Sequence, residues 1–186
     1  MEETLQIWNW SSFIFNVLSS LIGSFIFIFT LLFFLRPKFK IIKLIAKQDS
    51  PFDETNQICY AFKVVNKSLF SAYDIEARVN YYTLRQGENG IMHKIFHKIE
   101  LKTSKINYIP RDKLFVKNYG DNCTQFFTYE NISEEITKGN KYIQFQITAR
   151  HSLTGLSNIF TFDFVDSSFI KEGIFVAGDV CSIKKC

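Results

Sequence analysis

The stretch from Ile7 to Leu35 contains no charged residue, and every lysine and arginine of the chain lies from Arg36 onward. An α-helix rises about 1.5 Å per residue, so this stretch is long enough to cross the ~30 Å hydrocarbon core of a bilayer. Trp8 and Trp10 lie near its start, and indole rings favour the headgroup level. No basic residue precedes the run and no small-residue cleavage site follows it, which disfavours a cleaved signal peptide. The sequence predicts an N-terminal stub and transmembrane helix over residues 1–35.

The charges that flank this stretch predict its orientation. Glu2 and Glu3 precede it, whereas basic side chains follow it at once. Positively charged flanks remain on the cytoplasmic side of a membrane. We therefore expect a single-pass membrane protein with its N-terminus outside and its C-terminal domain in the cytosol. The basic residues are Arg36, Lys38, Lys40, Lys43 and Lys47.

Small and hydroxyl-bearing residues recur along one side of the predicted helix at three- and four-residue steps. Such a stripe has two interpretations, which the sequence leaves open. Small residues allow membrane helices to pack closely, and polar groups also line water-filled pores. A single helix cannot bury the stripe by itself, so we expect association with copies of the chain. The stripe consists of Ser12, Asn16, Ser19, Ser20, Gly23, Ser24 and Thr30.

The rest of the chain shows the two-residue alternation of β-strands. Residues 143–149, for example, alternate apolar side chains with Gln144, Gln146 and Thr148. A content of 47% hydrophobic and 17% aromatic residues excludes a disordered chain. The expected strands cover residues 39–47, 57–65, 72–85, 92–103, 113–117, 124–129, 141–151 and 158–165, with one more within 169–180.

This pattern predicts a mainly β fold, an immunoglobulin-like antiparallel β-sandwich that follows a single transmembrane α-helix. One short helix is expected after Asn131, which stands at capping-box spacing from Glu134 and is followed by Gly139. Residues 36–47 form a basic juxtamembrane connector and the first strand, and residues 48–186 form the cytosolic sandwich.

The motifs of common enzyme classes are absent from the sequence. It has no nucleophile elbow, P-loop, dinucleotide-binding glycine pattern or C-x-x-C pair. His93 and His97 are four residues apart on an expected strand, which places them too far apart to share a metal ion. We expect no enzyme activity, no metal site and no cofactor.

Basic residues of the predicted sandwich form a candidate site for a phosphate-bearing ligand. The formal charge of +4 is too small by itself to indicate a nucleic-acid partner. In a symmetric oligomer, however, each basic residue is repeated around an axis, which concentrates positive potential. The alternative is a solvated surface near anionic lipid headgroups. The candidate ligand-binding residues are Lys94, His97, Lys98, Lys102, Lys105, Arg111, Lys113, Arg150 and His151.

A single apolar helix, a basic connector from Arg36 and a cytosolic β-sandwich together resemble the layout of Hailong-type channel effectors of bacterial anti-phage defence. The strand–turn–strand unit from Ile143 to Phe164 is also similar to a hairpin in the cytosolic domain of inward-rectifier potassium channels. Those channels select potassium with a pore helix and a T-V-G-Y-G filter, which this sequence lacks.

The resemblance to the defence effectors implies a homotetramer in the bacterial inner membrane that conducts ions. It further implies a gate controlled by a nucleotide or short nucleic acid on the cytosolic domain, and a partner nucleotidyltransferase that makes this regulator. The alternative function is a membrane-tethered β-sandwich that binds a partner protein or acts as a scaffold, without pore activity.

Overall fold

The computed structural model describes residues 2–52, 57–111, 120–139, 141–152 and 155–185. The chain divides into two compact units, Met1–Arg36 and Pro37–Cys186. The expected strand over residues 113–117 lies outside the described residues.

The first unit contains the helix α1 (Glu2–Phe34). Its segment Trp10–Phe33 is long and apolar enough to cross a membrane, and none of it is buried within the chain. Two hydroxyls of the stripe bond to carbonyls one turn earlier: Ser24 Oγ donates to Ser20 O at 2.9 Å, and Thr30 Oγ1 to Ile26 O at 2.7 Å. These hydroxyls are therefore compatible with a lipid environment.

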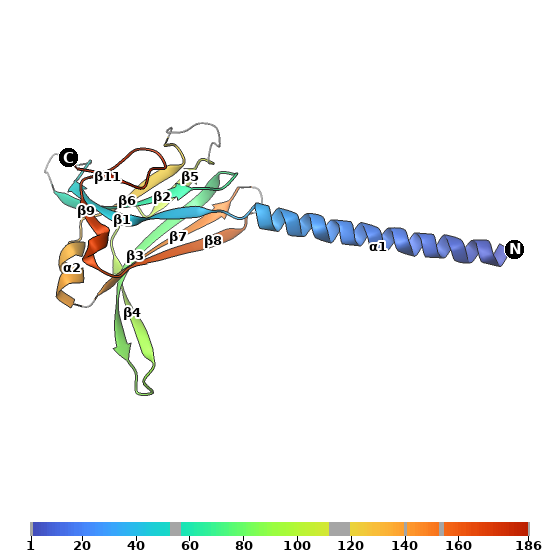
Figure 1. Ribbon diagram of the computed structural model, residues 1–186, viewed down its shortest axis with the longest axis horizontal. Coiled ribbons are helices and arrows are strands. Elements are labelled where there is room, and N and C mark those ends of the chain that lie inside the picture. Colours follow the sequence, from blue (N-terminus) through green and yellow to red (C-terminus); the bar gives the residue numbers. More distant parts are fainter. Residues whose placement is uncertain (1, 53–56, 112–119, 140, 153–154, 186) are drawn as a thin grey trace. The chain divides into compact units, whose positions relative to one another are not determined.

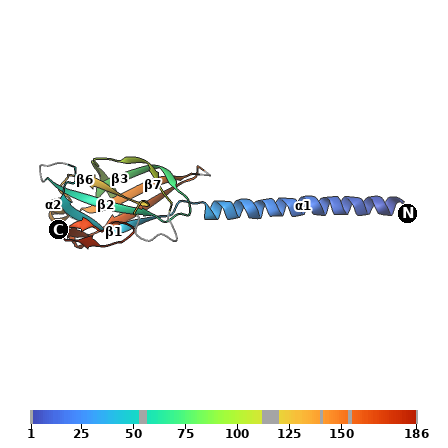
Figure 2. The ribbon, with the colours of Figure 1, turned by 90° about the horizontal axis from the view of Figure 1, so that it is seen from above.

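The second unit is built on two sheets, which face each other in Figures 1 and 2. The pairings of the described strands are antiparallel, apart from the parallel pair β1–β9. Sheet A contains, in spatial order, β6 (Cys123–Thr128), β2 (Ile58–Asn66), β1 (Phe39–Asp49) and β9 (Ile170–Glu172). Sheet B contains β4 (Met92–Ile99), β3 (Ala72–Gln86), β7 (Tyr142–His151) and β8 (Ser157–Phe164), with β5 (Lys105–Ile109) also paired to β3.

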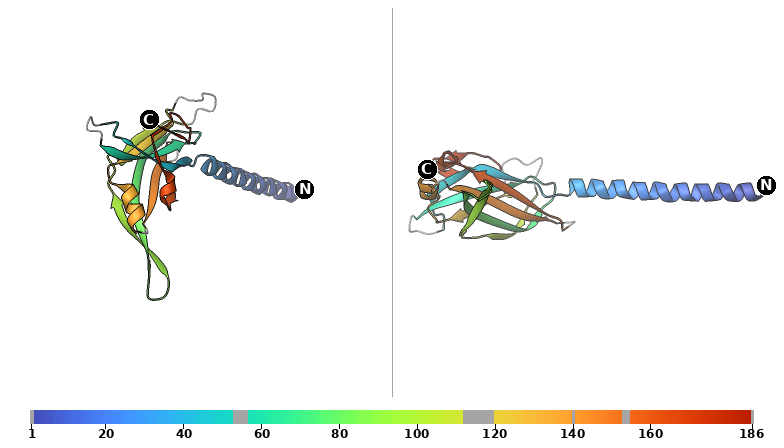
Figure 3. Two further views of the ribbon diagram at one scale, coloured as in Figure 1. Left: turned by 60° about the vertical axis from the view of Figure 1, so that its left-hand side comes forward. Right: turned by 90° about the horizontal axis from the view of Figure 1, so that it is seen from below.

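The remaining elements are short. They are α2 (Ile132–Gly139), the 3₁₀ helix η1 (Ser167–Phe169), β10 (Ile174–Phe175) and β11 (Ile183–Lys184). The hairpin of β3 and β4 extends beyond the rest of sheet B, as the left view of Figure 3 shows.

The distribution of strands between the sheets is that of the immunoglobulin fold. Strands β1, β2 and β6 share one sheet, whereas β3, β7 and β8 share the other. In an immunoglobulin domain, strands A, B and E lie in one sheet and C, F and G in the other. The expected fold class, an apolar N-terminal helix followed by an antiparallel β-sandwich, is confirmed.

The core between the sheets is aromatic. Phe62 of sheet A stacks on Phe145 of sheet B, with 5.1 Å between ring centroids. Phe164 meets Phe62 edge-on at 5.9 Å. Ile132 of α2 is also buried in this core, so α2 packs against the apolar side chains between the sheets.

A second, smaller apolar cluster lies on the outer face of sheet A. Residues 173–185, called here the C-terminal segment, cover this face. Phe175 and Ile183 of the segment contact the face, which thereby becomes a second buried layer. The buried members of this cluster are Ile42, Ala46, Ala61, Val65 and Phe175.

Two expected strands differ from the observed ones. The strand expected over 92–103 ends at Ile99, and a separate strand, β5, begins at Lys105. Between them the chain bonds to sheet A, because Lys102 N donates to Phe127 O at 2.8 Å. The region 169–180 contains two short strands, β9 and β10, in place of a single longer one.

Candidate functional site

The short helix α2 begins where its N-terminal residues bond to one another. Asn131 Oδ1 accepts a hydrogen bond from Glu134 N at 3.4 Å, and Asn131 Nδ2 donates to the Glu134 carboxylate at 3.1 Å. Side-chain oxygens at this position satisfy a backbone donor that the helix itself leaves unpaired. The capping spacing in the sequence therefore fixes the start of α2, as expected.

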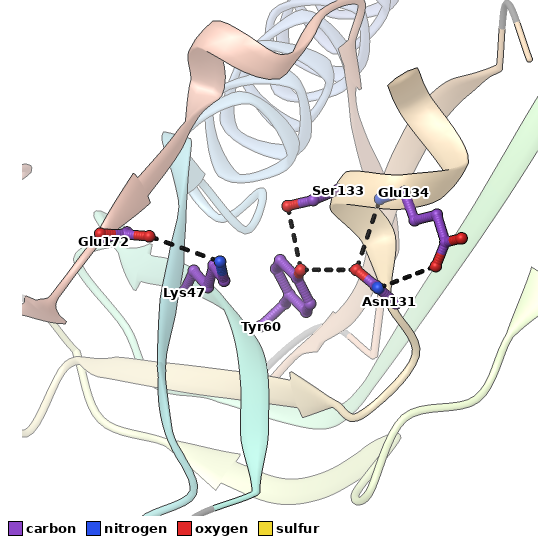
Figure 4. A network of polar contacts seen from close by, with 6 residues as sticks. All are labelled: Lys47, Tyr60, Asn131, Ser133, Glu134 and Glu172. Atoms are coloured by element: carbon purple, nitrogen blue, oxygen red, sulfur yellow. Dashed lines mark hydrogen bonds and ion pairs between the residues drawn. The ribbon is translucent and has the colours of Figure 1, made fainter. Parts of the chain in front are cut away.

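A buried tyrosine connects this cap to sheet A (Figure 4). The Tyr60 hydroxyl lies 3.0 Å from Asn131 Oδ1, to which it donates, and also 3.0 Å from Ser133 Oγ. Tyr60 is 2% exposed, so its ring belongs to the core while its hydroxyl reaches the N-terminus of α2. This arrangement holds β2 and α2 at a defined separation.

A cavity of about 680 Å³ lies beside this network. Lys47, the cross-strand partner of Tyr60, contributes an ammonium group to the wall of this cavity. Lys47 contacts Glu172 at 3.5 Å, and this carboxylate is 81% exposed. Such a surface pair is weak, so the Lys47 ammonium is available to another anion. The lining residues are Lys47, Gln57, Ile58, Tyr60, Tyr129, Asn131, Ser133, Glu134 and Thr137.

A second cavity, of about 340 Å³, shares Lys47 and Ile58 with the first. Lys185 contributes another ammonium, and Gln48 contributes an amide. Gln48 is 9% exposed, and no described residue donates a hydrogen bond to its Oε1. This oxygen is enclosed by the chain itself, and the other polar groups that line the cavity include the carboxylates of Asp49 and Glu172. The two ammonium groups of this cavity could bind an anionic group of a ligand.

The predicted basic residues of β4 lie on both faces of sheet B. Cross-strand partners share a face, and Tyr82 lies opposite both Phe96 and Tyr142. By this register Lys94 and Lys98 lie on the outer face of sheet B. His97 lies on the opposite face, stacked on Tyr81 at 5.4 Å. The expectation had treated residues 92–103 as one strand and did not separate its two faces.

Lys94 is part of a cluster around Asp163. Asp163 Oδ2 accepts hydrogen bonds from Lys94 Nζ and Tyr82 Oη, both at 3.0 Å, and Oδ1 accepts one from Gln144 Nε2 at 2.9 Å. Burial acts to raise the pKa of Asp163, but these three donors together hold the pKa below its usual value. The hydrogen bond to Asp163 raises the pKa of Lys94. The charge of Lys94 is therefore already compensated within the chain.

Two other predicted residues also have acidic neighbours. Lys98 pairs with Glu100 at 2.8 Å, and Arg150 with Asp74 at 3.0 Å. Arg150 and Lys105 line one cavity of about 340 Å³, whose wall also includes Asp74 and Glu76. This cavity brings together two of the predicted residues, Arg150 and Lys105. The negative charges of Asp74 and Glu76 offset the positive charges of these two residues.

The remaining predicted residues are dispersed. His151 is 2% exposed and packs against Phe70 at 5.2 Å, so it is a core side chain and not part of an anion-binding turn. Its position could have been foreseen, since it continues the inward-facing alternation of β7. Lys102 lies against the ring of Phe52, Arg111 is exposed, and Lys113 lies outside the described residues.

The cavity residues Lys47 and Tyr60 were missed by the sequence-based prediction. Tyr60 occupies an apolar position of an alternating strand, and Lys47 continues the series of basic residues after the helix. The capping spacing at Asn131 was the one sequence pattern that pointed to this region. It predicted the position of α2, but it did not predict that α2 lies beside Tyr60 and Lys47.

Comparisons with known proteins add little to this geometry. No protein-family model matches the chain, and no curated protein matches it. Among solved structures, the crystal structure of Spo0M, a sporulation control protein from Bacillus subtilis, is similar with a TM-score of 0.37 and 10% sequence identity. The match covers 73% of this chain and spans about half, 49%, of the Spo0M chain.

Proposed function

We propose that this chain is the subunit of a homo-oligomeric, single-pass membrane effector that forms an ion-conducting pore in bacterial anti-phage defence. Four copies would surround the pore, with their N-termini outside and their sandwich domains in the cytosol. A nucleotide or short nucleic acid bound to the sandwich would control the gate. The chain itself would catalyse no reaction, and a partner nucleotidyltransferase would supply the regulator.

The observation that carries this proposal is the polar stripe on a helix of membrane length. Every described stripe side chain is exposed on an isolated helix, from Ser12 to Thr30. Ser24 and Thr30 bond within their own helix, whereas the amide of Asn16 has two donors and one acceptor to satisfy. An unsatisfied amide in hydrocarbon is costly, which favours contact with neighbouring copies or with pore water.

The cavities beside α2 support the binding of a charged regulator. Lys47 and Lys185 offer ammonium groups in one cavity, beside the carboxylates of Asp49 and Glu172. We infer that the regulator binds in these two adjoining cavities, where Lys47 and Lys185 lie together, whereas Lys94 on the outer face of sheet B is bonded to the partly buried Asp163.

The pore is tested by reconstituting the full chain in liposomes and measuring ion flux. Replacement of Asn16 and Ser20 by leucine removes the polar groups and should abolish flux. The matched control is Val17→Leu with Leu21→Ile on the opposite side, which should leave flux unchanged. Absence of flux from verified wild-type oligomers, with and without nucleotides, would contradict the pore and favour the tethered binding module.

The regulator site is tested in the same liposomes with mononucleotides and short single-stranded DNA as probes. Lys47→Ala should weaken the response of flux to the active probe at least tenfold. Lys105→Ala should change it much less, because Lys105 lines a separate cavity on sheet B. The reverse order would place the regulator on sheet B.

A further inference from the structure

The connection between helix and sandwich is short. Residues 35–38 are all that separates the end of α1 at Phe34 from the start of β1 at Phe39. An extended chain spans at most about 3.6 Å per residue, so this linker bridges no more than about 18 Å. With α1 across a bilayer, the end of the sandwich at which the chain enters is held near the headgroup layer. This end is called the entry end below.

Hydrogen bonds and strand registers define which segments share the entry end. Lys38 N donates to Ser68 Oγ and Lys67 N donates to Lys38 O, each at 2.7 Å. The β2–β3 loop (residues 67–71) therefore lies beside the chain entry. Ala72 at the start of β3 pairs with Ile109 at the end of β5 and with His151 at the end of β7. The described residues that follow β5 and β7 consequently lie at this end as well.

The entry end exposes apolar and tyrosine side chains. Leu69 in the β2–β3 loop is 49% exposed, and Leu156 after β7 is 37% exposed. Tyr73 and Tyr108 are 43% and 46% exposed, and their rings pack against each other at 5.1 Å. Tyrosine rings have an apolar body and a polar tip, which suits the boundary between headgroups and acyl chains.

The charges of the entry end complement an anionic surface. Two of its carboxylates are held in ion pairs, Asp74 with Arg150 and Asp179 with Lys67, at 3.0 and 2.8 Å. Basic side chains near a membrane are attracted to anionic lipids. The exposed basic residues at or next to this end are Arg36, Lys38, Lys40 and Arg111.

The opposite end of the sandwich has a different character. The residues around α2 include the acidic side chains Glu130, Glu134 and Glu135. The tip of the β3–β4 hairpin exposes Ile91 but also carries Glu88. Exposed apolar residues occur at both ends, whereas the exposed basic residues named above distinguish the entry end from the acidic surroundings of α2.

We infer that the entry end of the sandwich docks on the headgroup layer of an anionic bilayer. Leu69 and Leu156 insert below the headgroups, Tyr73 and Tyr108 lie at the boundary, and the basic residues contact lipid phosphates. This inference rests on the part of the proposed function in which α1 crosses the membrane, and it requires neither a pore nor a regulator.

The test uses the full chain in nanodiscs, with the exposed cysteines replaced by serine and a single new cysteine carrying a fluorescent label. Leu69→Cys and Leu156→Cys place the label at the entry end, and Ile91→Cys is the matched control at the hairpin tip. Lipids with a nitroxide at acyl carbon 5 should quench the entry-end labels several-fold more than the control when phosphatidylglycerol is present. The double variant Lys38→Glu with Arg111→Glu should reduce this quenching.

A label at Leu21→Cys separates the two ways in which the experiment can fail. Quenching at position 21 without quenching at 69 and 156 would overturn the docking while α1 still spans the bilayer. Equal quenching at 91 and 156 would also overturn it. Absence of quenching at position 21 would instead remove the membrane span itself, and with it both proposals.

Discussion

The two sheets of the sandwich differ in what covers their outer faces. The C-terminal segment lies over the outer face of sheet A, where it buries an apolar cluster around Ala61 and Phe175. The outer face of sheet B has no such cover over Lys94 and Lys98, which are exposed. Both sheets alternate in the same way along their strands. The comparison shows that a segment distant in sequence, and not the strand pattern, decides whether an outward side chain is buried.

Lys63 illustrates the consequence for sheet A. It points to the outer face of the sheet, yet it is 1% exposed. Its ammonium donates to Val176 O at 2.7 Å and Val180 O at 3.1 Å, both in the C-terminal segment. Burial lowers the pKa of Lys63. On an open face, the Lys63 ammonium would be solvated. Here it binds two carbonyl groups of the C-terminal segment and attaches the segment to sheet A.

The largest expected effect on stability comes from truncating Phe175, the buried apolar side chain of the C-terminal segment. Phe175→Ala leaves a cavity on sheet A, so we expect the free energy of unfolding to fall by about 3 kcal/mol. Denaturation of the full chain in detergent, followed by far-ultraviolet circular dichroism, measures this loss. The chain's 2 tryptophans, Trp8 and Trp10, both lie in α1, so tryptophan fluorescence would not report on the sandwich.

The matched control is Phe96→Ala on the outer face of sheet B. Phe96 is 47% exposed and contacts Tyr82 at 5.5 Å. Its truncation should cost less than about 1 kcal/mol. Equal losses for the two phenylalanines would show that the C-terminal segment does not cover sheet A in solution.

A smaller effect is expected from Lys63→Met. This change leaves two carbonyls of the C-terminal segment without their donor, which should cost about 2 kcal/mol at pH 7. Because the folded-state pKa of Lys63 lies below its unfolded value of about 10.4, the wild type gains stability as pH rises between the two. The variant lacks this gain, so the difference in unfolding free energy should widen with pH.

Lys98→Met is the control for that change, since its side chain is 72% exposed and pairs with an exposed Glu100. Surface pairs contribute between about 0 and 1 kcal/mol, so the unfolding free energy should change little. A Lys63→Met protein as stable as the wild type from pH 7 to 10 would contradict the role assigned to Lys63.

The smallest effect is expected on sheet B, from Asp163→Asn. Loss of the charge weakens the bonds from Lys94 and Tyr82, which should cost about 1 kcal/mol at pH 7. The lowered pKa of Asp163 contributes stability above the unfolded value of about 3.9, and this contribution is lost as pH falls through the folded pKa. The gap between wild type and variant should therefore close on acidification, as measured by the same denaturation experiments.

Asp74→Asn provides the comparison for Asp163, because Asp74 also pairs with one basic residue but is 65% exposed. Its replacement should change the unfolding free energy by less than about 0.5 kcal/mol. If Asp74 and Asp163 behaved alike, the outer face of sheet B would contain no stabilising cluster.

The sequence predicted the elements whose pattern is local. The β7–β8 hairpin and the start of α2 follow from alternation and capping, which involve residues near each other in the chain. The break at Ile99 was missed because the bond that causes it, from Lys102 N to Phe127 O, joins two sheets. The burial of Lys63 was missed for the same reason, since its partners lie more than a hundred residues later.

The candidate cavities were beyond prediction for a related reason. Lys47, Tyr60 and Asn131 come from three elements, and they meet because α2 packs against the ends of β1 and β2. Residue types alone favoured the basic residues near β4, but Lys94 proved to be compensated by Asp163. Ion pairs between different strands cannot be predicted from the sequence until the register of those strands is known.

The turn at Gly173 limits how the C-terminal segment can be rearranged. Gly173 has a φ of +123°, and a Cβ atom there would come within 2.2 Å of Lys184 O. Gly173 N also donates to Lys47 O of β1 at 3.0 Å, and any residue with a side chain in this position would clash with the Lys184 carbonyl. A glycine at this one position therefore restricts the register between β10 and β11, at the point where the segment leaves the edge of β1.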